Sequence, residues 1–229
     1  MAEPFLVIFD CDGVLVDSEI VAARVEAELL AKAGFEITPE ELAATYSGLT
    51  FRDILMRIER EADMVLSASL IEEAEKLVDD RLAAEVKAIA GAREAVLASG
   101  ANRCICSNSS SRRLKTTLTK TGLWPHFEGR VFSSLETPSG KPKPAPDVYL
   151  HAAATLGAEA RQTFVIEDSV HGVAGARAAG MRVIGFTGAS HTHPGHADML
   201  TEAGAETVIA RHADLPATLA ALAAWSDAF

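Results

Sequence analysis

The sequence predicts an α/β protein in which a parallel sheet has helices on both faces and an all-helical domain is inserted near the start. The short, continuous apolar run at 5–9 is typical of a strand buried on both faces of a parallel sheet. From about residue 104 such runs alternate with helical stretches, as in βαβ units. The segment 17–87 interrupts this order, because it carries several helical patterns and no convincing strand.

The alternating part predicts a Rossmann-like core made of residues 1–16 and 88–229. After the strand at 5–9, the expected strands are 104–106, 163–166, 182–186 and 207–209, and the expected helices are about 110–121, 145–156, 170–179 and 214–223. Gly122 and Gly180 follow two of these helices, where glycine readily takes the left-handed conformation that ends a helix.

The inserted domain, 17–87, is expected to hinge near residues 14–18 and 86–91. Ser18 and Glu19 open its first helix, which ends at Gly34 and has Val21, Val25 and Leu29 at fourfold spacing. Residues 38–41 (Thr-Pro-Glu-Glu) form a capping box with proline at the first helical position. Ser69 and Glu72 open a long helix whose inner face would be Ile71, Ala74, Val78, Leu82, Val86 and Ile89.

Composition excludes several classes of protein. The 229 residues include 21 Lys and Arg against 32 Asp and Glu, a net charge of −11, which disfavours broad binding to nucleic acids or anionic membranes. No apolar run approaches the about 20 residues that span a bilayer, and the first residues lack the pattern of a signal peptide. Cys11, Cys104 and Cys106 have spacings that indicate neither disulfides nor a zinc site. We expect a reduced, cytoplasmic protein with no nucleic-acid or membrane partner, as a monomer or small homo-oligomer.

Asp10 and Asp12 follow the first expected strand directly. Side chains two residues apart on an extended chain point the same way, so the two carboxylates would share one site. Ligands of open α/β sheets bind at the carboxyl ends of the strands, where this pair lies. A turn with two solvated aspartates is the simpler interpretation of the pair taken alone.

Other strand ends carry polar residues too. Ser107 and Asn108 precede a helix, where phosphate is readily bound, although plain helix capping is the alternative. Glu167 and Asp168 form a second carboxylate pair, and such oxygen ligands suit Mg²⁺, with surface turn chemistry as the alternative. The proline-rich turn 140–147 presents Lys141 and Lys143 before a helix, or is merely a basic loop.

Four segments of the chain resemble, in order, the motifs of the haloacid dehalogenase superfamily. They are DCDGVLVDSE from residue 10, SNSS from residue 107, KPAPDVYL at 143–150 and IEDSVHGVAGARAAGM at 166–181. The helical insertion resembles the cap of the subgroup that contains β-phosphoglucomutase and small-molecule phosphatases. The resemblance covers nearly the whole chain.

The resemblance implies a role for each motif residue. Asp10 would be the nucleophile that forms an aspartyl-phosphate, and Asp12 the acid and then the base. Mg²⁺ would be held by the Asp10 carboxylate, the Asp12 carbonyl and Asp168, with Glu167 as a direct or indirect partner. Ser107 and Lys143 would bind the phosphoryl oxygens, and Asn108 would help to orient the site. The Lys-Pro-Ala-Pro-Asp register favours Lys143, with Lys141 as the alternative.

Among the reactions of such proteins, the sequence favours a Mg²⁺-dependent phosphatase of small phosphorylated metabolites, most plainly a sugar or sugar-acid phosphate. A general acid at Asp12 indicates phosphoryl transfer rather than dehalogenation. The histidine common at the cap start of β-phosphoglucomutase-like proteins is replaced by Ala22, which disfavours a phosphosugar mutase. That mutase and a non-catalytic phosphate-binding protein stay as alternatives.

The cap segment 47–52 resembles a substrate-specificity loop, so Gly48 and Arg52 would face the substrate, although a surface ion pair is an equal alternative for Arg52.

Two further features are expected to carry little chemistry. His191, His193 and His196 are interpreted as a polar loop after a strand, with a minor role near the site left open. Cys11 should point away from Asp10 and into the core, because it is the middle residue of an extended triplet.

Overall fold

The sheet of this protein has six parallel strands in the order β3-β2-β1-β4-β5-β6. The structure is a computed structural model that describes residues 5–46 and 49–226. The strands are β1 (Leu6–Phe9), β2 (Arg103–Ser107), β3 (Val131–Ser133), β4 (Thr163–Glu167), β5 (Arg182–Phe186) and β6 (Thr207–Ile209). The predicted fold class is confirmed, but β3 was missed, because this three-residue edge strand is too short and too little buried to show a buried apolar run.

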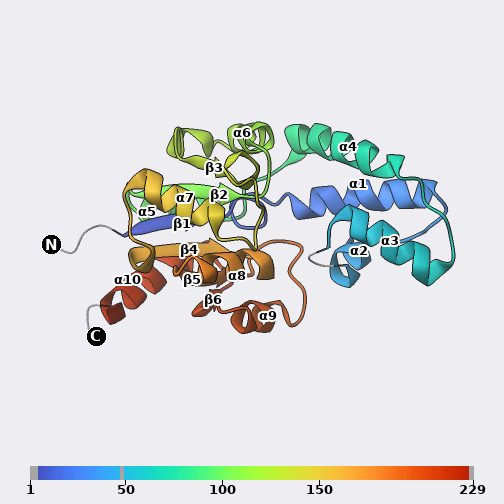
Figure 1. Ribbon diagram of the computed structural model, residues 1–229. Helices are drawn as coiled ribbons and strands as arrows, with labels where there is room; N and C mark the ends of the chain where they lie inside the picture. The colour runs from blue at the N-terminus through green and yellow to red at the C-terminus, as the bar shows by residue number, and fades with distance from the viewer. Residues whose placement is uncertain (1–4, 47–48, 227–229) are drawn as a thin grey trace.

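Helices cover both faces of the sheet (Figure 1). Alternate residues of β1 point to opposite faces, so Val7 and Phe9 belong to one apolar cluster and Leu6 and Ile8 to the other. The first cluster includes residues of α5 (Ala92–Ala98), α6 (Ser111–Lys120) and α10 (Leu215–Ser226), and the second those of α7 (Asp147–Leu156), α8 (Val170–Ala178) and α9 (His196–Glu202). The short helices α5 and α9 were not expected from the sequence.

Four further helices lie together, apart from the sheet, at the right of Figure 1. They are α1 (Glu19–Lys32), α2 (Pro39–Thr45), α3 (Phe51–Ala62) and α4 (Ser69–Glu85), and they share a small apolar core of their own. The two chain segments that lead into and out of this group run side by side: the Asp17 amide donates to the Lys87 carbonyl at 2.9 Å. Val16 and Ala88 form an antiparallel bridge. This pairing supports the proposed boundaries of the cap, residues 17–87.

Two helix starts in the cap, those of α2 and α4, were predicted from similar sequence signals, and only α2 carries a side-chain cap. The capping box of Thr38 and Glu41 is present at α2, as predicted. The predicted start of α4 at Ser69 is confirmed, but Ala68 is its N-cap residue and no side chain caps this helix. Of the predicted inner face of α4, Val86 and Ile89 are buried but lie beyond the helix, which ends at Glu85. Gly122 and Gly180 have the expected left-handed conformation, with φ of 73° and 75°.

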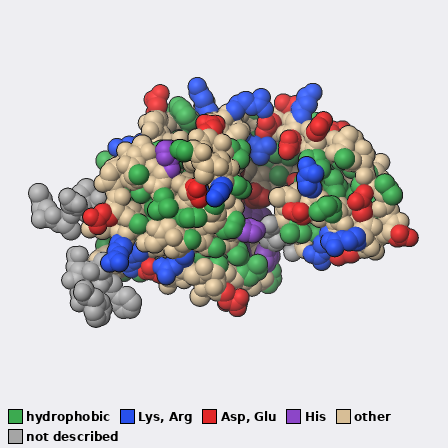
Figure 2. Space-filling model, viewed as in Figure 1, with side chains coloured by type: hydrophobic (Ala, Val, Ile, Leu, Met, Phe, Trp, Pro, Cys, Tyr) green, Lys and Arg blue, Asp and Glu red, His purple; other side chains and the backbone are tan. Residues whose placement is uncertain are grey.

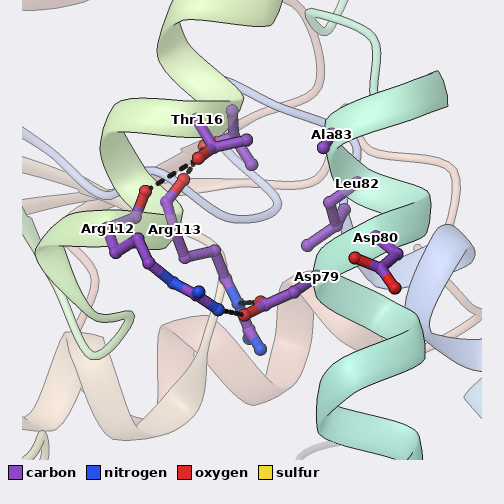
Figure 3. Close-up of a pocket in the computed structure, with 8 residues that line it drawn as sticks. Asp79, Asp80, Leu82, Ala83, Arg112, Arg113 and Thr116 are labelled. Carbon is purple, nitrogen blue, oxygen red and sulfur yellow. Dashed lines mark hydrogen bonds and ion pairs between the residues drawn. The ribbon is translucent and has the colours of Figure 1, made fainter.

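The cap and the core also meet where α4 packs beside α6. Asp79 of α4 forms ion pairs with Arg112 and Arg113 of α6, the second at 2.7 Å. Figure 3 shows both guanidinium groups reaching across a small pocket to this one carboxylate. Within the described ranges, no helix is both long and apolar enough to cross a membrane.

Candidate active site

The carboxyl ends of β1, β2 and β4 bring four polar side chains to one edge of the sheet. Asp10 follows β1, Ser107 ends β2, and Glu167 and Asp168 lie at the end of β4. All four are buried. The three strands are neighbours and parallel, so residues 60 to 160 positions apart in sequence meet in one place. Buried charged side chains need partners, and the lysine turn supplies one.

Lys143 lies at the centre of this group. Its ammonium nitrogen is 2.5 Å from Asp10 Oδ1 and 2.6 Å from Glu167 Oε1, and it donates to the Cys106 carbonyl at 2.8 Å. Its side chain is 3% exposed, whereas Lys141 lies on the surface. Of the two lysines that the sequence left open, Lys143 is therefore the one that reaches the strand ends.

Asn108 holds the lysine turn in place. Its side-chain oxygen accepts hydrogen bonds from the Lys143 amide at 2.8 Å and from the Ser134 hydroxyl at 2.9 Å. Asn108, which the resemblance implied would help to orient the site, thus positions the backbone of Lys143. Ser134 was not anticipated, because it follows the missed strand β3.

Asp12 lies beside the cluster with contacts of its own. Its Oδ1 accepts from the Ser18 hydroxyl and its Oδ2 from the Ser109 hydroxyl, both at 2.7 Å, and Ser107 Oγ is 3.4 Å away. Ser18 and Glu19 open α1, as predicted, with Ser18 as the N-cap residue, but the Ser18 hydroxyl donates to Asp12 instead of capping the helix. Between the two aspartates, Cys11 is fully buried in the apolar core, as expected.

Burial and crowding of carboxylates set the electrostatics of the site. Burial raises the pKa of Asp10 well above its usual value; Lys143 opposes this, and repulsion from Glu167 and Asp168 adds to it. Burial also raises the pKa of Asp168. For Lys143, burial lowers the pKa, but Asp10 and Glu167 outweigh it and raise the pKa well above the ordinary value. The lysine therefore stays charged.

The carboxylates fit a divalent cation. Asp10, Glu167 and Asp168 each offer an oxygen, and these oxygens lie within 4.8 Å of one another. Lys143 pairs with two of these carboxylates, Asp10 and Glu167, and together with Asp168 they form a buried donor set of oxygens, of the kind that Mg²⁺ prefers. The Asp12 carboxylate is not part of this group, since hydroxyls occupy both of its oxygens.

The two carboxylates at the end of β4, Glu167 and Asp168, differ in how many protein donors occupy their oxygens. Glu167 accepts from Lys143, from the Tyr149 hydroxyl at 3.0 Å and from the Ser169 amide and hydroxyl, so protein donors occupy both of its oxygens. Asp168 packs against Gly13, where an added Cβ would lie 1.9 Å from its Oδ2. Gly13 also has a φ of +78°, so this turn requires glycine.

The histidine loop reaches the site, which corrects the expectation of a merely polar loop. His191 Nε2 is 3.1 Å from Asp168 Oδ2, and His196 Nε2 is 2.7 Å from the Asp168 carbonyl oxygen. His193 stacks on His196 at 5.1 Å between ring centroids. The available signal was the position of these histidines just beyond the carboxyl end of β5, which is the same edge of the sheet.

Of the two predicted cap residues, the structure describes only Arg52 and does not bring it to this group. Gly48 lies outside the described residues. Arg52 is exposed in the first turn of α3, and the structure shows no hydrogen bond or ion pair between it and any described residue of the site. Figure 2 shows the surface hollowed between the core and the cap, with histidine side chains at the core side of the hollow.

Comparison with known proteins agrees with this geometry. A model of the haloacid dehalogenase-like hydrolase family matches residues 7–186. The chain is 29% identical over 189 residues to 6-phosphogluconate phosphatase of Escherichia coli K12, covering 82% of this chain and 85% of that protein. It is 30% identical over 195 residues to hexitol phosphatase B of the same strain, covering 77% of this chain and 81% of that protein.

A solved structure is also similar over almost the whole chain. It is that of a conserved haloacid dehalogenase-like protein of unknown function from Agrobacterium tumefaciens C58, with a TM-score of 0.91 and 56% identity, covering 95% of this chain and 98% of that one. The family model spans well over half of the chain, and the motif residues meet where the resemblance implied. The chain therefore belongs to the haloacid dehalogenase-like hydrolases.

Proposed function

We propose that this protein is a Mg²⁺-dependent phosphatase that hydrolyses a small phosphomonoester through an aspartyl-phosphate on Asp10. The observation that carries the proposal is the buried pair of Asp10 and Lys143 beside Asp168 at the carboxyl edge of the sheet. Membership of the family and the names of the two E. coli relatives, both phosphatases, support a hydrolase of phosphomonoesters. A small phosphorylated metabolite, such as a sugar or sugar-acid phosphate, is the proposed substrate.

Asp10 is the proposed nucleophile. Its carboxylate attacks phosphorus, the ester oxygen leaves, and water later hydrolyses the acyl phosphate. An anion that approaches another anion needs compensating charge, and Lys143 supplies part of it at 2.5 Å from Asp10. A Mg²⁺ ion held by Asp10, Asp168 and the Asp12 carbonyl would supply the rest by neutralising charge on the phosphoryl oxygens. Glu167 is proposed to hold Lys143 in position, because protein donors already occupy its oxygens.

Asp12 is the proposed acid and base. It would protonate the leaving oxygen and then take a proton from the attacking water. Its hydrogen bonds from Ser18 and Ser109 fix the carboxylate beside the nucleophile. Ser107, which ends the neighbouring strand, is proposed to bind a phosphoryl oxygen, and Asn108 to position Lys143. Ser18 belongs to the segment that leads into the cap, so it couples the cap to the proposed acid.

The proposed nucleophile is tested with Asp10→Asn. We expect hydrolysis of p-nitrophenyl phosphate and of sugar phosphates to fall by about 10³-fold or more, because an amide cannot form the acyl phosphate. Released phosphate measures the activity, and circular dichroism checks that the fold persists. The matched control, Asp198→Asn on the exposed face of α9, should keep full activity. Undiminished turnover by the folded Asp10→Asn variant would contradict the mechanism.

The proposed metal is tested by its removal. Chelation should abolish hydrolysis and added Mg²⁺ should restore it, because uncompensated carboxylates repel the phosphate. Asp168→Asn should raise the Mg²⁺ concentration for half-maximal activity at least about tenfold, as the loss of a ligand does. Full activity in chelator would exclude the metal.

With a hexose 1-phosphate and trace bisphosphate, free phosphate as product supports the phosphatase, whereas an isomerised sugar phosphate would indicate a mutase instead.

A further inference from the structure

Helix α1 begins at the proposed site and runs into the cap. The hydroxyl of Ser18, the residue before the helix, donates to Asp12 at 2.7 Å. Glu19 is therefore the first helical residue beyond the proposed acid, and the charges of Asp12 and Asp168 help to raise its pKa. The side chains that follow on the same face of α1 lead from the site into the cap.

Glu19 and Glu26 share one face of α1. They are seven residues apart, which is close to two turns and about 10 Å along the helix axis. At 100° per residue their face lies between two buried stripes: Ala23 and Leu30, which belong to the cap core, and Val25 and Leu29, which belong to the main core. The two carboxylates thus lie between two buried stripes of the helix, with Glu19 exposed and Glu26 half-buried.

These two carboxylates have no partner within the described residues, since the structure shows neither a hydrogen bond nor an ion pair from either of them. The cations that act on Glu19 are His191 and Arg113, and each is engaged elsewhere. His191 contacts Asp168, and Arg113 is bound to Asp79 at 2.7 Å, as Figure 3 shows. The two glutamates therefore keep their acceptor oxygens free.

The face of α1 that carries Glu19 and Glu26 is open to water but partly shielded by surrounding protein atoms. Water reaches Glu19, yet protein atoms on most sides partly desolvate it, and this burial together with repulsion from Asp12 raises its pKa to about 7. Glu26 is half-buried, and burial and then repulsion from Glu19 raise its pKa to about 8. The hollow between core and cap in Figure 2 lies where α1 leaves the core.

We propose that Glu19 and Glu26 select substrates whose part remote from the phosphate is uncharged and rich in hydroxyls, a polyol or sugar phosphate rather than a sugar-acid phosphate. The inference rests on the proposed phosphatase function. Substrate hydroxyls can donate to the free carboxylate oxygens, which raises the affinity for such a substrate. Above about pH 8, where both glutamates carry most of their charge, a second anionic group would face two negative charges, which lowers its affinity.

The test uses two esters that differ at one carbon. Glucitol 6-phosphate ends in CH₂OH where 6-phosphogluconate ends in a carboxylate. At about pH 8.5, where both glutamates are mostly charged, we expect kcat/KM for the polyol ester to exceed that for the acid ester by about tenfold or more. Glu19→Gln and Glu26→Gln keep the shape of the side chain and remove its charge, so each should lower this ratio at least about threefold, mainly by improving turnover of the acid ester.

The control variant is Glu28→Gln, on the exposed opposite face of α1, where Glu28 is paired with Arg81. It should leave the ratio unchanged. Equal kcat/KM for the two esters, preference for the acid ester, or a parallel fall for both esters in the two variants would overturn this inference. If p-nitrophenyl phosphate is still hydrolysed in those cases, the proposed function stands. Failure to release phosphate from any of the three esters would overturn the proposed function and the inference with it.

Discussion

Among single residues, Lys143 contributes both to the buried interactions of the fold and to the proposed site. It sits between two carboxylates from different strands, and its own backbone is held by Asn108 from a third. Removing one member of a buried ion pair leaves the other charge without compensation, which costs far more than losing a surface pair. The same residue therefore supports both the fold and the proposed chemistry.

Lys143→Met is predicted to lose both activity and stability. The free energy of unfolding should fall by about 3–5 kcal/mol, because Asp10 and Glu167 would stay buried without their cation. Urea unfolding and phosphate release measure the two effects. Lys141→Met, two residues away on the surface, should change the free energy of unfolding by less than about 0.5 kcal/mol. Similar effects of the two substitutions would contradict the assignment of Lys143.

Among the elements, α2 and α4 begin with sequence signals of the same kind, and only the first is used. At α2, Thr38 Oγ1 accepts from the Glu41 amide at 3.2 Å, while Glu41 accepts from the Thr38 amide at 3.1 Å. At α4 the helix starts one residue earlier than the signal requires, so the Ser69 side chain makes no cap. The tertiary position of the preceding loop decides whether a serine or threonine stands at the N-cap, as Thr38 does at α2, or an alanine, as Ala68 does at α4.

Thr38→Ala should therefore destabilise the cap more than Ser69→Ala does. The first substitution removes a cap, which costs about 1 kcal/mol, and the second should cost a few tenths at most. Thermal unfolding followed by circular dichroism at 222 nm compares the two variants. Equal melting temperatures for the two variants would show that the capping box contributes nothing.

At the scale of the whole molecule, His212 joins distant parts of the chain. It is fully buried, its Nε2 lies 2.7 Å from the Val14 carbonyl oxygen, and its ring stacks on Phe186 at 4.3 Å. Burial lowers the pKa of His212, although the hydrogen bond to Val14 opposes this. The unfolded chain binds a proton at this residue near pH 6.5, and the folded chain does so only at a lower pH.

Stability should therefore fall on acidification. The contribution of His212 is present in full above about pH 6.5 and is lost as the pH falls toward the lowered pKa of the folded state, because the unfolded state gains the proton first. His212→Gln should flatten the decline in free energy of unfolding between pH 7 and pH 5, measured by urea titration. The exposed His171→Gln should keep the slope of the unsubstituted protein. An unchanged slope in His212→Gln would contradict this assignment.

The sequence by itself determined the α/β class, five of the six strands, the helical insertion and the motif residues, because buried strands, helix caps and strand-end motifs are local patterns. It could not show β3, whose three residues owe their pairing to β2. It favoured Lys143 through the register of one motif but left Lys141 open, since both precede prolines in one turn. It placed Ser18 at a helix start without its contact to Asp12 and interpreted the histidines as a polar loop, because the partners Asp12 and Asp168 are supplied by other segments.

Only the tertiary structure decided these points. Parallel strands must return to the same edge through crossover helices, so the neighbours of a strand-end residue come from distant parts of the chain and leave no mark in local spacing. Burial then selects among chemically similar candidates, because a charged side chain is tolerated inside only where partners meet it. That is why Lys143 lies in the site and Lys141 does not, and why the unpartnered Glu19 and Glu26 stand out.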